Sequence, residues 1–331
     1  MANYSIGVDL GGTNLRIAVV DETGSLLEKV TLDTKVKLGR DHVVRDMCGA
    51  VQQMVGKHRN SGSLQGIGIG VPGIIDMRTG MVHESPNLPD WTDYPVRTEI
   101  EKQLGTRVVL ENDANSAALG EKWLGAAREM NDMAMLTLGT GVGGGLVLDG
   151  RVWHGMIGMA AEFGHTTVES EGALCGCGNH GCLEAYASAT AVVRMAKEAV
   201  ANGGPTGLSK IQDLSAKAVF DLAQKGDPAA KKVYATVGRA LGIVLSGMVN
   251  ALNLPMYVIG GGVSAAWDVF APAMFQELRS RSMVFKATDP DRGVGNGNPG
   301  QATTKTIITR ARLGSDAGLF GAARLPQVNG H

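Results

Sequence analysis

The sequence predicts an α/β protein of two lobes with a central cleft between them. Strands and helices are mixed along the chain, and 331 residues exceed the ~100–200 residues of one typical domain. Segments 6–21 and 135–150 also share a pattern of strand, Gly-Thr loop, strand and turn. We interpret this repeat as an internal duplication in which each copy forms the core of one lobe.

Apolar runs and turn residues place the elements in order. The expected strands, which end at glycine or turn residues, are 4–10, 15–20, 26–32, 65–71, 107–110, 133–138, 146–148, 256–259 and 304–309. The expected helices, with apolar residues at helical spacing, are 41–60, 114–124, 188–202, 214–225, 227–252, 265–283 and 315–324. The glycine-rich polar segment 286–303 is expected to be a mobile loop.

Composition argues against two classes of partner. Lys and Arg number 31 and Asp and Glu 32, so the chain has no excess basic charge for nucleic acid. No apolar run reaches the ~18–20 residues of a membrane span, and the first twelve residues lack the features of a signal peptide. We therefore expect a cytoplasmic protein with neither a nucleic-acid nor a membrane partner.

Three glycine-rich loops follow apolar strands and could bind phosphate through backbone N–H groups. One such loop alone is better explained as a tight hairpin, but three together favour phosphate binding. They contain Gly11, Gly12 and Thr13; Gly139, Thr140 and Gly141 with 143–145; and 260–262.

Other residues near these loops qualify this interpretation. Asp9 precedes the first loop, so it either caps a turn or faces a cation such as Mg²⁺ that offsets phosphate charge. No P-loop motif is present. Gly68, Gly70 and Gly73 match a dinucleotide-binding pattern, but Pro72 interrupts it and no helix follows, so we regard the match as accidental.

Segment 111–115 (ENDAN) places polar groups where a strand ends and a helix begins. Several polar side chains at a strand end are costly unless they bind a polar ligand, and a sugar with many hydroxyls suits them. Asp113 could instead be the N-cap of the helix. Asn87 could join the site from a nearby loop or could be an ordinary turn residue.

Cys175, Cys177 and Cys182 lie close enough in sequence to bind one zinc ion, with His165 or His180 as the fourth ligand. Such a closed site would be structural. Three reduced core cysteines are the weaker alternative. Cys48 is expected in the core of helix 41–60. A zinc-ordered loop would also direct the flanking Glu162 and Glu184 into the cleft. His58 and His154 show no partner in the sequence and are expected to be structural.

The chain resembles the ROK family of sugar kinases over essentially its whole length. The motifs that carry the resemblance are DLGGTNLR (9–16), ENDAN (111–115), LGTGVGG (138–144), EFGH (162–165) and CGCGNHGCLE (175–184). The resemblance implies the actin-like ATPase (ribonuclease H-like) fold. It also implies a small lobe formed by 1–112 with 310–331 and a large lobe formed by 113–309.

The resemblance further implies a reaction, in which the γ-phosphate of ATP passes to the 6-hydroxyl of D-glucose with Asp113 as general base. Mg²⁺ would accompany ATP, and a structural Zn²⁺ would be held by His165, Cys175, Cys177 and Cys182. The implied hexose ligands are Gly73, Asn87, Asn112, Asp113, Glu162, His165 and Glu184. The implied ATP ligands are Asp9, Gly11, Gly12, Thr13, Asn14, Arg16, Gly139, Thr140, Gly141, Gly261 and Gly262. A homo-oligomer, dimer or tetramer, is also implied.

Several alternatives stay open at this point. The acceptor could be mannose, fructose, N-acetylmannosamine or N-acetylglucosamine, and polyphosphate could replace ATP. A sugar-sensing regulator without catalysis would need a helix-turn-helix extension, for which the strand expected from residue 4 leaves no room. An actin-type ATPase without a small acceptor is disfavoured by segment 111–115 and by the cysteines.

Overall fold

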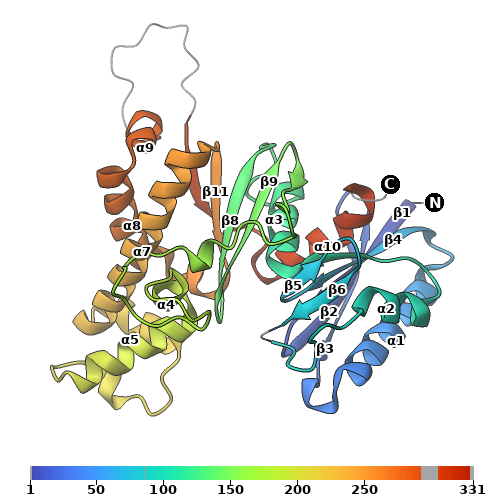
Figure 1. The fold of residues 1–331 in the computed structure, drawn as a ribbon, viewed down its shortest axis with the longest axis horizontal. Helices are drawn as coiled ribbons and strands as arrows, with labels where there is room; N and C mark the ends of the chain where they lie inside the picture. The colour runs from blue at the N-terminus through green and yellow to red at the C-terminus, as the bar shows by residue number, and fades with distance from the viewer. Residues whose placement is uncertain (1, 86, 292–304, 329–331) are drawn as a thin grey trace, which may run out of the picture. The chain divides into compact units, whose positions relative to one another are not determined.

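The computed structural model describes residues 2–85, 87–291 and 305–328 and divides into two compact units (Figure 1). The first unit comprises Met1–Asp132, Gly145–Ala161 and Arg312–His331, and the second comprises Met133–Gly144 and Glu162–Ala311. The lobe boundary expected after residue 112 therefore falls inside the first unit.

The reason for this difference is close packing between helices α3 (Asp113–Trp123) and α10 (Ala317–Val328). A Cβ atom on Gly321 would lie 1.7 Å from the carbonyl oxygen of Ser116, and one on Gly120 would lie 2.1 Å from that of Ala317. Because both positions are glycine, the two backbones can approach each other, and α3 stays with the first unit.

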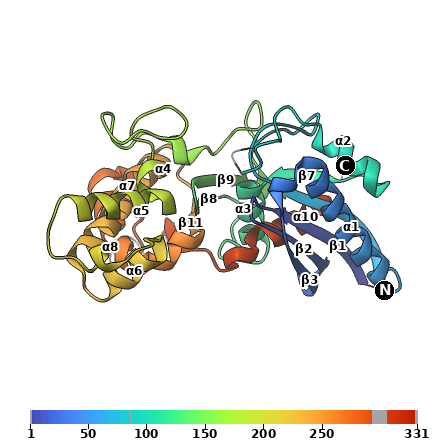
Figure 2. The ribbon, with the colours of Figure 1, turned by 90° about the horizontal axis from the view of Figure 1, so that it is seen from below.

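The first sheet has the strand order β3-β2-β1-β4-β7, and β3, β2 and β1 lie side by side in Figure 2. β1 runs antiparallel to β2 and parallel to β4, which is parallel to β7. The strands are β1 (Ala2–Leu10), β2 (Asn14–Asp21), β3 (Leu26–Asp33), β4 (Gly62–Val71) and β7 (Val109–Asn112), with a separate pair β5 (Ile74–Asp76) and β6 (Met81–Glu84).

The two faces of this sheet are covered by different helices. Ile17 and Val19 of β2 pack in a core with α1 (Arg40–His58), whereas Ala18 and Val20 pack against α10. This alternation follows from the two-residue period of a strand. Helix α1 buries the apolar face expected for it, including Cys48, which is 2% exposed. Helix α2 (Val96–Leu104) contributes Val96 and Ile100 to the same core.

The second sheet repeats the topology of the first. Its order is β10-β9-β8-β11-β12, in which, as in the first sheet, the first strand lies between the second and the fourth. β11 is parallel to both β8 and β12. The strands are β8 (Met133–Leu138), β9 (Val142–Leu148), β10 (Arg151–Val152), β11 (Met256–Gly260) and β12 (Ile307–Arg310). The repeat supports the inferred duplication and confirms the predicted α/β actin-like fold class.

Most of the described α-helices lie in the second unit. They are α4 (Glu184–Ala187), α5 (Ala189–Ala201), α6 (Ala216–Gln224), α7 (Pro228–Leu252), α8 (Trp267–Arg281) and α9 (Met283–Thr288). In the part of the chain that the structure describes, the short 3-10 helices are η1 (Val36–Leu38), η2 (Phe163–His165), η3 (Gly207–Lys210), η4 (Gly262–Ala266) and η5 (Gly314–Asp316).

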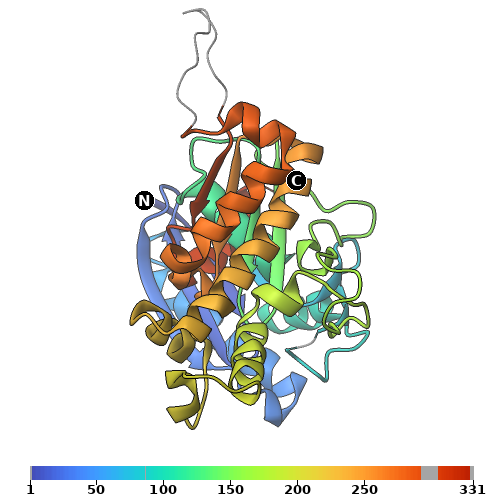
Figure 3. The ribbon, with the colours of Figure 1, turned by 90° about the vertical axis from the view of Figure 1, so that its left-hand side faces the viewer.

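Helix α7 matches the expected helix 227–252. It begins at Pro228, and the carboxylate of the capping residue Asp227 accepts the Ala230 N–H at 2.9 Å. α7 and α8 run side by side (Figure 3), and Gly238 and Gly242 of α7 leave room for the α8 backbone. Among the helices that the structure describes, only α7 is long and apolar enough to cross a membrane. Since 56% of its apolar stretch is buried in the protein, this is weak evidence for a membrane span.

Local differences from the expected elements concern short segments. The strand expected at 107–110 is β7 (Val109–Asn112), so Glu111 and Asn112 belong to the strand itself. The expected helix 265–283 ends at Arg281, and α9 restarts after Ser282, whose hydroxyl accepts the Phe285 N–H. The expected loop at 286–303 therefore begins with helical residues, and its positions 292–304 lie outside the described residues. Neither α2 nor the β5-β6 pair was expected.

Candidate functional site

The junction between β7 and α3 is organised by a buried carboxylate. Glu111 is 0% exposed, and its oxygens accept three hydrogen bonds. These come from the Asn112 N–H at 2.9 Å, the Asn115 side-chain amide at 3.1 Å and the His154 Nε2 at 2.7 Å. Because each donor is directed at Glu111, its burial is compensated and the junction is held in one conformation.

Asn112 is the N-cap of α3. Its side-chain oxygen accepts the N–H groups of Ala114 at 2.9 Å and Asn115 at 3.2 Å. Its amide donates to the carbonyl of Gly73 at 3.2 Å. The interpretation of Asp113 as the cap is therefore wrong, because Asn112 has the extended backbone that a cap requires.

Asp113 is instead the first residue of α3, and its Oδ1 lies 2.9 Å from the Ala114 N–H. A carboxylate in the first turn of a helix is stabilised by the positive end of the helix dipole. The hydrogen bond from Asn112 to Gly73 also brings two of the expected hexose residues together beside Asp113.

The first glycine loop connects β1 and β2. The Gly11 N–H donates to the Asn14 carbonyl at 2.9 Å, and the Thr34 hydroxyl donates to the Gly11 carbonyl at 2.6 Å. A Cβ atom on Gly12 would lie 2.8 Å from the Asn87 carbonyl oxygen, so only glycine allows this contact. Thr13 and Asn87 are exposed. An expected hexose residue, Asn87, therefore lies directly against the first expected phosphate loop.

Asp9 faces Arg16 across the β1–β2 pair, and the Arg16 guanidinium binds its carboxylate at 2.7 Å. Burial raises the pKa of Asp9, while the charge of Arg16 opposes that shift. Arg16 also donates to the Ser315 carbonyl, and Lys29 pairs with Asp316 at 2.6 Å. Asp9 is thus one member of a charge network and does not simply cap a turn.

The second glycine loop is fixed by residues of α4 and α5. Glu184 accepts the Val142 N–H at 2.8 Å, and a Cβ atom on Gly141 would lie 2.4 Å from the same carboxylate. The Ala189 N–H donates to the Gly139 carbonyl at 2.8 Å, and the Thr190 hydroxyl donates to the Thr140 carbonyl at 2.8 Å. These bonds occupy carbonyl oxygens of the loop, and the N–H groups of Thr140 and Gly141 have no backbone partner among the bonds described.

The third glycine loop lies beside the second. Gly261 has a φ of 81°, and a Cβ atom on it would lie 2.4 Å from the Leu138 carbonyl oxygen, immediately before Gly139. A Cβ atom on Gly262 would have no neighbour within 4 Å. The parallel pairing of β8 and β11 accounts for this proximity, because it brings the ends of the two strands to one edge of the sheet.

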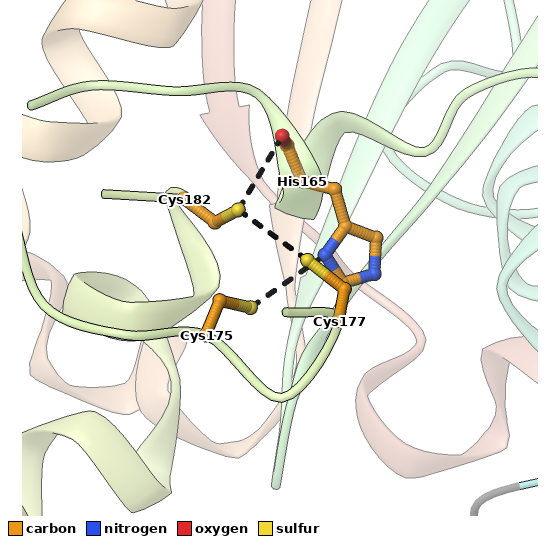
Figure 4. Close-up of side chains that lie close together, drawn as sticks. All are labelled: His165, Cys175, Cys177 and Cys182. Carbon is orange, nitrogen blue, oxygen red and sulfur yellow. Dashed lines mark hydrogen bonds between the residues drawn. The ribbon is translucent and has the colours of Figure 1, made fainter. Parts of the chain in front are cut away.

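The three clustered cysteines and His165 form a compact group (Figure 4), in which one ligand atom from each lies within 4.8 Å of the others. The sulfurs of Cys177 and Cys182 are 3.7 Å apart, and His165 Nδ1 is 3.8 Å from the Cys175 sulfur. Zn–S bonds of about 2.3 Å in a tetrahedron place two sulfurs about 3.8 Å apart, so the group fits zinc. His180, the other candidate, donates from Nδ1 to the Gly172 carbonyl of its own loop at 3.0 Å.

Two carboxylates adjoin this group. Glu184 lies 3.6 Å from the Cys175 sulfur, and Glu162 lies 4.0 Å from His165 Nε2. The two nitrogens of His165 thus face different neighbours, one the cysteines and the other Glu162. Partial desolvation raises the pKa of Glu162, although its side chain is 47% exposed. The charge of His165 opposes this shift and that of Glu184 adds to it. This environment can bind neutral hydroxyl groups as well as charge.

The structure therefore brings the predicted residues together in two groups, one within each unit. Those of the first unit are Asp9, Gly11, Gly12, Thr13, Asn14, Arg16, Gly73, Asn87, Asn112 and Asp113. Those of the second are Gly139, Thr140, Gly141, Glu162, His165, Cys175, Cys177, Cys182, Glu184, Gly261 and Gly262. The dinucleotide-binding pattern of Gly68, Gly70 and Gly73 does not form a phosphate-binding loop, because Gly68 and Gly70 lie within β4.

One contact could not be predicted from the sequence, namely the hydrogen bond between His154 and Glu111. These residues are 43 positions apart, and neither their spacing nor their neighbours predicts that they meet. The loop that carries His154 follows the β9–β10 hairpin. The turn of this hairpin, at Asp149 and Gly150, is the one expected at the end of segment 135–150, and both residues have positive φ angles.

Comparison with known proteins extends these observations. Residues 5–328 match the ROK family. A glucokinase of Thermotoga maritima is 38% identical, over 97% of this chain and 96% of that protein. A ROK hexokinase from Thermus thermophilus has a similar structure, with a TM-score of 0.79, 34% identity and coverage of 99% of this chain and all of the other.

A ROK family glucokinase from Streptomyces griseus, in complex with glucose and AMPPNP, has a TM-score of 0.76 and 32% identity. The similarity covers 98% of this chain and 99% of that structure. The family match at residues 5–328 spans both units. The chain belongs to the ROK family.

Proposed function

We propose that this protein is a glucokinase, which transfers the γ-phosphate of ATP to the 6-hydroxyl of D-glucose. The observation that carries the proposal is the β7–α3 junction, where an Asn112 cap and a buried Glu111 present the Asp113 carboxylate at the start of a helix. The glucokinase of Thermotoga maritima and the glucose complex of the Streptomyces griseus enzyme support this choice of substrates.

Asp113 would accept the proton of the 6-hydroxyl as the oxygen attacks phosphorus. Phosphoryl transfer depends mostly on positioning and on charge neutralisation. We assign the glucose contacts to Gly73, Asn87, Asn112, Asp113, Glu162, His165 and Glu184. We assign the ATP contacts to Asp9, Gly11, Gly12, Thr13, Asn14, Arg16, Gly139, Thr140, Gly141, Gly261 and Gly262.

The glycine loops offer backbone N–H groups without side chains that would obstruct phosphate. Arg16 adds a positive charge beside them, held in place by Asp9. Mg²⁺ bound with ATP would supply further charge neutralisation, and Asp9 is the carboxylate placed to contact it or its water shell.

We also propose that His165, Cys175, Cys177 and Cys182 hold a structural zinc ion. Four protein ligands would leave no position for water, so the ion would order the segment and take no chemical step. Glu162 and Glu184 adjoin this group, to which His165 belongs, and Glu184 also binds the second glycine loop. The zinc would therefore stabilise hexose residues and a phosphate loop together.

The test is a coupled assay that measures ADP formation with and without glucose. A glucokinase forms ADP at a rate that depends on glucose and yields glucose 6-phosphate. A panel of mannose, fructose, N-acetylmannosamine and N-acetylglucosamine, each with ATP or polyphosphate, establishes the preferred pair. A rate of ADP formation that does not depend on any of these sugars would contradict the proposal and favour an actin-type ATPase. Sugar binding without turnover would favour a regulator.

The role of Asp113 is tested by Asp113→Asn, with the exposed Asp213→Asn as control. We expect loss of turnover in the first variant and normal turnover in the second. Calorimetry should show that Asp113→Asn still binds glucose, because its amide keeps the shape of the carboxylate. A near-normal kcat in Asp113→Asn would remove this residue from the mechanism.

A cytoplasmic location and a homo-oligomer of two or four chains complete the proposal. Analytical ultracentrifugation of the purified protein measures the second point directly, and a monomer at micromolar concentration would contradict it.

A further inference from the structure

The carboxylate of Glu111 is at the centre of the junction that presents Asp113, yet it has no assigned function. It is 0% exposed and accepts hydrogen bonds from Asn112, Asn115 and His154. Two of these donors lie within four residues of Glu111 and belong to the junction itself. The third, His154, comes from a different loop.

Among the ion pairs described, His154 is the one partner of Glu111, and the pair is ionic when the imidazole is protonated. Its Nε2 lies 2.7 Å from Glu111 Oε2, and its side chain is 29% exposed. The hydrogen bond to Glu111 raises the pKa of His154, against the opposing effect of burial. The loop is itself anchored, since the Trp153 N–H donates to Leu146 at 2.7 Å and the Ala160 N–H donates to the His154 carbonyl at 3.1 Å.

The geometry couples this pair to the start of α3. His154 holds one oxygen of Glu111, while the other oxygen accepts both the Asn112 N–H and the Asn115 amide. Asn112 in turn caps α3 and binds Gly73, so a rotation of the Glu111 carboxylate would displace both the cap and the first helical residue, Asp113. A displacement of about 1 Å at a reacting group can cost ~100-fold in rate.

We propose that His154 is a positioning residue for phosphoryl transfer, which acts through Glu111 to fix the direction of the Asp113 carboxylate. This inference rests on the proposed function, in which Asp113 is the general base. His154 would act indirectly, without contacting the substrate. Its contribution is a hydrogen bond that orients Glu111, and a neutral donor at the same place can supply it.

The chain provides a matched control. His58 and Glu28 form a second pair in the same unit, with the same Nε2 to Oε2 distance of 2.7 Å, between α1 and β3. Loss of either pair removes one histidine–carboxylate bond. Only loss of the His154 pair should alter the junction that presents Asp113.

The kinetic test compares His154→Ala, His154→Gln and His58→Ala with the wild type. We expect kcat to fall about 10–100-fold in His154→Ala with little change in the KM for ATP. His154→Gln, whose amide can still donate to Glu111, should keep kcat within about threefold of wild type. A kcat in His154→Ala that matches His58→Ala overturns the proposal, as does a His154→Gln variant that is as impaired as His154→Ala.

A second measurement does not depend on activity. Hydrogen–deuterium exchange of a peptide that covers 109–118 should become faster in His154→Ala and stay unchanged in His58→Ala, because only the first loses the anchor of Glu111. Unchanged exchange in His154→Ala overturns the proposal even if the protein proves not to phosphorylate glucose. If Asp113→Asn is inactive but His154→Ala is normal in both measurements, the inference fails while the proposed function stands.

Discussion

Replacement of Asn112 by alanine should affect stability and catalysis separately, and the structure allows both effects to be worked out. The variant loses the side-chain acceptor of the Ala114 and Asn115 N–H groups and the donor to the Gly73 carbonyl. Ala114 keeps a second acceptor, Asp113 Oδ1 at 2.9 Å. The net loss is therefore one capping bond and one bond to Gly73.

The expected cost follows from these two bonds. Loss of a helix N-cap typically costs ~1 kcal/mol, and a net hydrogen bond such as that to Gly73 contributes ~1 kcal/mol. The free energy of unfolding should fall by about 2 kcal/mol, which corresponds to a decrease in Tm of about 4–8 °C for units of this size. If Asn112 also contacts glucose as proposed, kcat/KM for glucose should fall at least about tenfold, since ~1.4 kcal/mol equals a factor of ten.

The matched control is Ser215→Ala, which removes the N-cap of α6, where the Ser215 hydroxyl accepts the Ala218 N–H at 3.1 Å. This variant should lose ~1 kcal/mol of stability and keep its kinetics. Urea unfolding followed by circular dichroism measures the first quantity, and the coupled assay measures the second. If Asn112→Ala loses stability but keeps the wild-type kcat/KM for glucose, Asn112 is only a cap and its assignment as a hexose ligand is refuted.

Three further predictions follow from other contacts. Glu121→Gln should lower the free energy of unfolding by about 2–4 kcal/mol, because the Glu121 carboxylate is 0% exposed and accepts three backbone N–H groups, from residues 126, 312 and 313. Glu129→Gln, at an exposed position, should change the free energy of unfolding by less than about 0.5 kcal/mol. Equal stability of the two variants in urea would contradict this prediction. The pKa of His154 is raised above its usual value of 6.5, so its ion pair with Glu111 stabilises the folded state fully below pH ~6.5 and less as pH rises through the raised pKa. The difference in the free energy of unfolding between wild type and His154→Gln should therefore shrink between pH 6 and pH 9. A difference that does not depend on pH would contradict this prediction. Cys175→Ser should lose bound zinc, measured by elemental analysis, and should show a higher KM for glucose in the coupled assay. The control Cys48→Ala should keep its zinc. A zinc-free Cys175→Ser variant with a normal KM would show that the metal group does not support the hexose site.

The elements predicted from the sequence alone were those with a local cause. Strands β1, β2, β8 and β9 follow from apolar runs interrupted by glycine, and the duplication follows from the likeness of 6–21 and 135–150. The start of α7 follows from a local Asp-Pro pair. The three cysteines of the Cys/His group could be named because they lie within eight positions of each other. Their spacing left two histidines possible as the fourth ligand, the family resemblance implied His165, and the structure places His165 beside the sulfurs.

Other features depended on contacts between distant segments. Sequence could not distinguish Asn112 from Asp113 as the cap, because both side chains suit that position and only the backbone angles of the folded strand end select one. The pairing of Asp9 with Arg16 depends on strand register, and that of Glu111 with His154 on a loop 43 residues away. The assignment of α3 to the first unit depends on glycines in two helices that meet only after folding.

Local propensity and motif spacing act through neighbours in the chain, so they identified the elements, the glycine loops and the chemical types of the site residues. Hydrogen bonds and ion pairs between distant segments form only when the whole chain has packed. Tertiary structure therefore decided which carboxylates are neutralised, which side chain caps α3 and which histidine faces the cysteines.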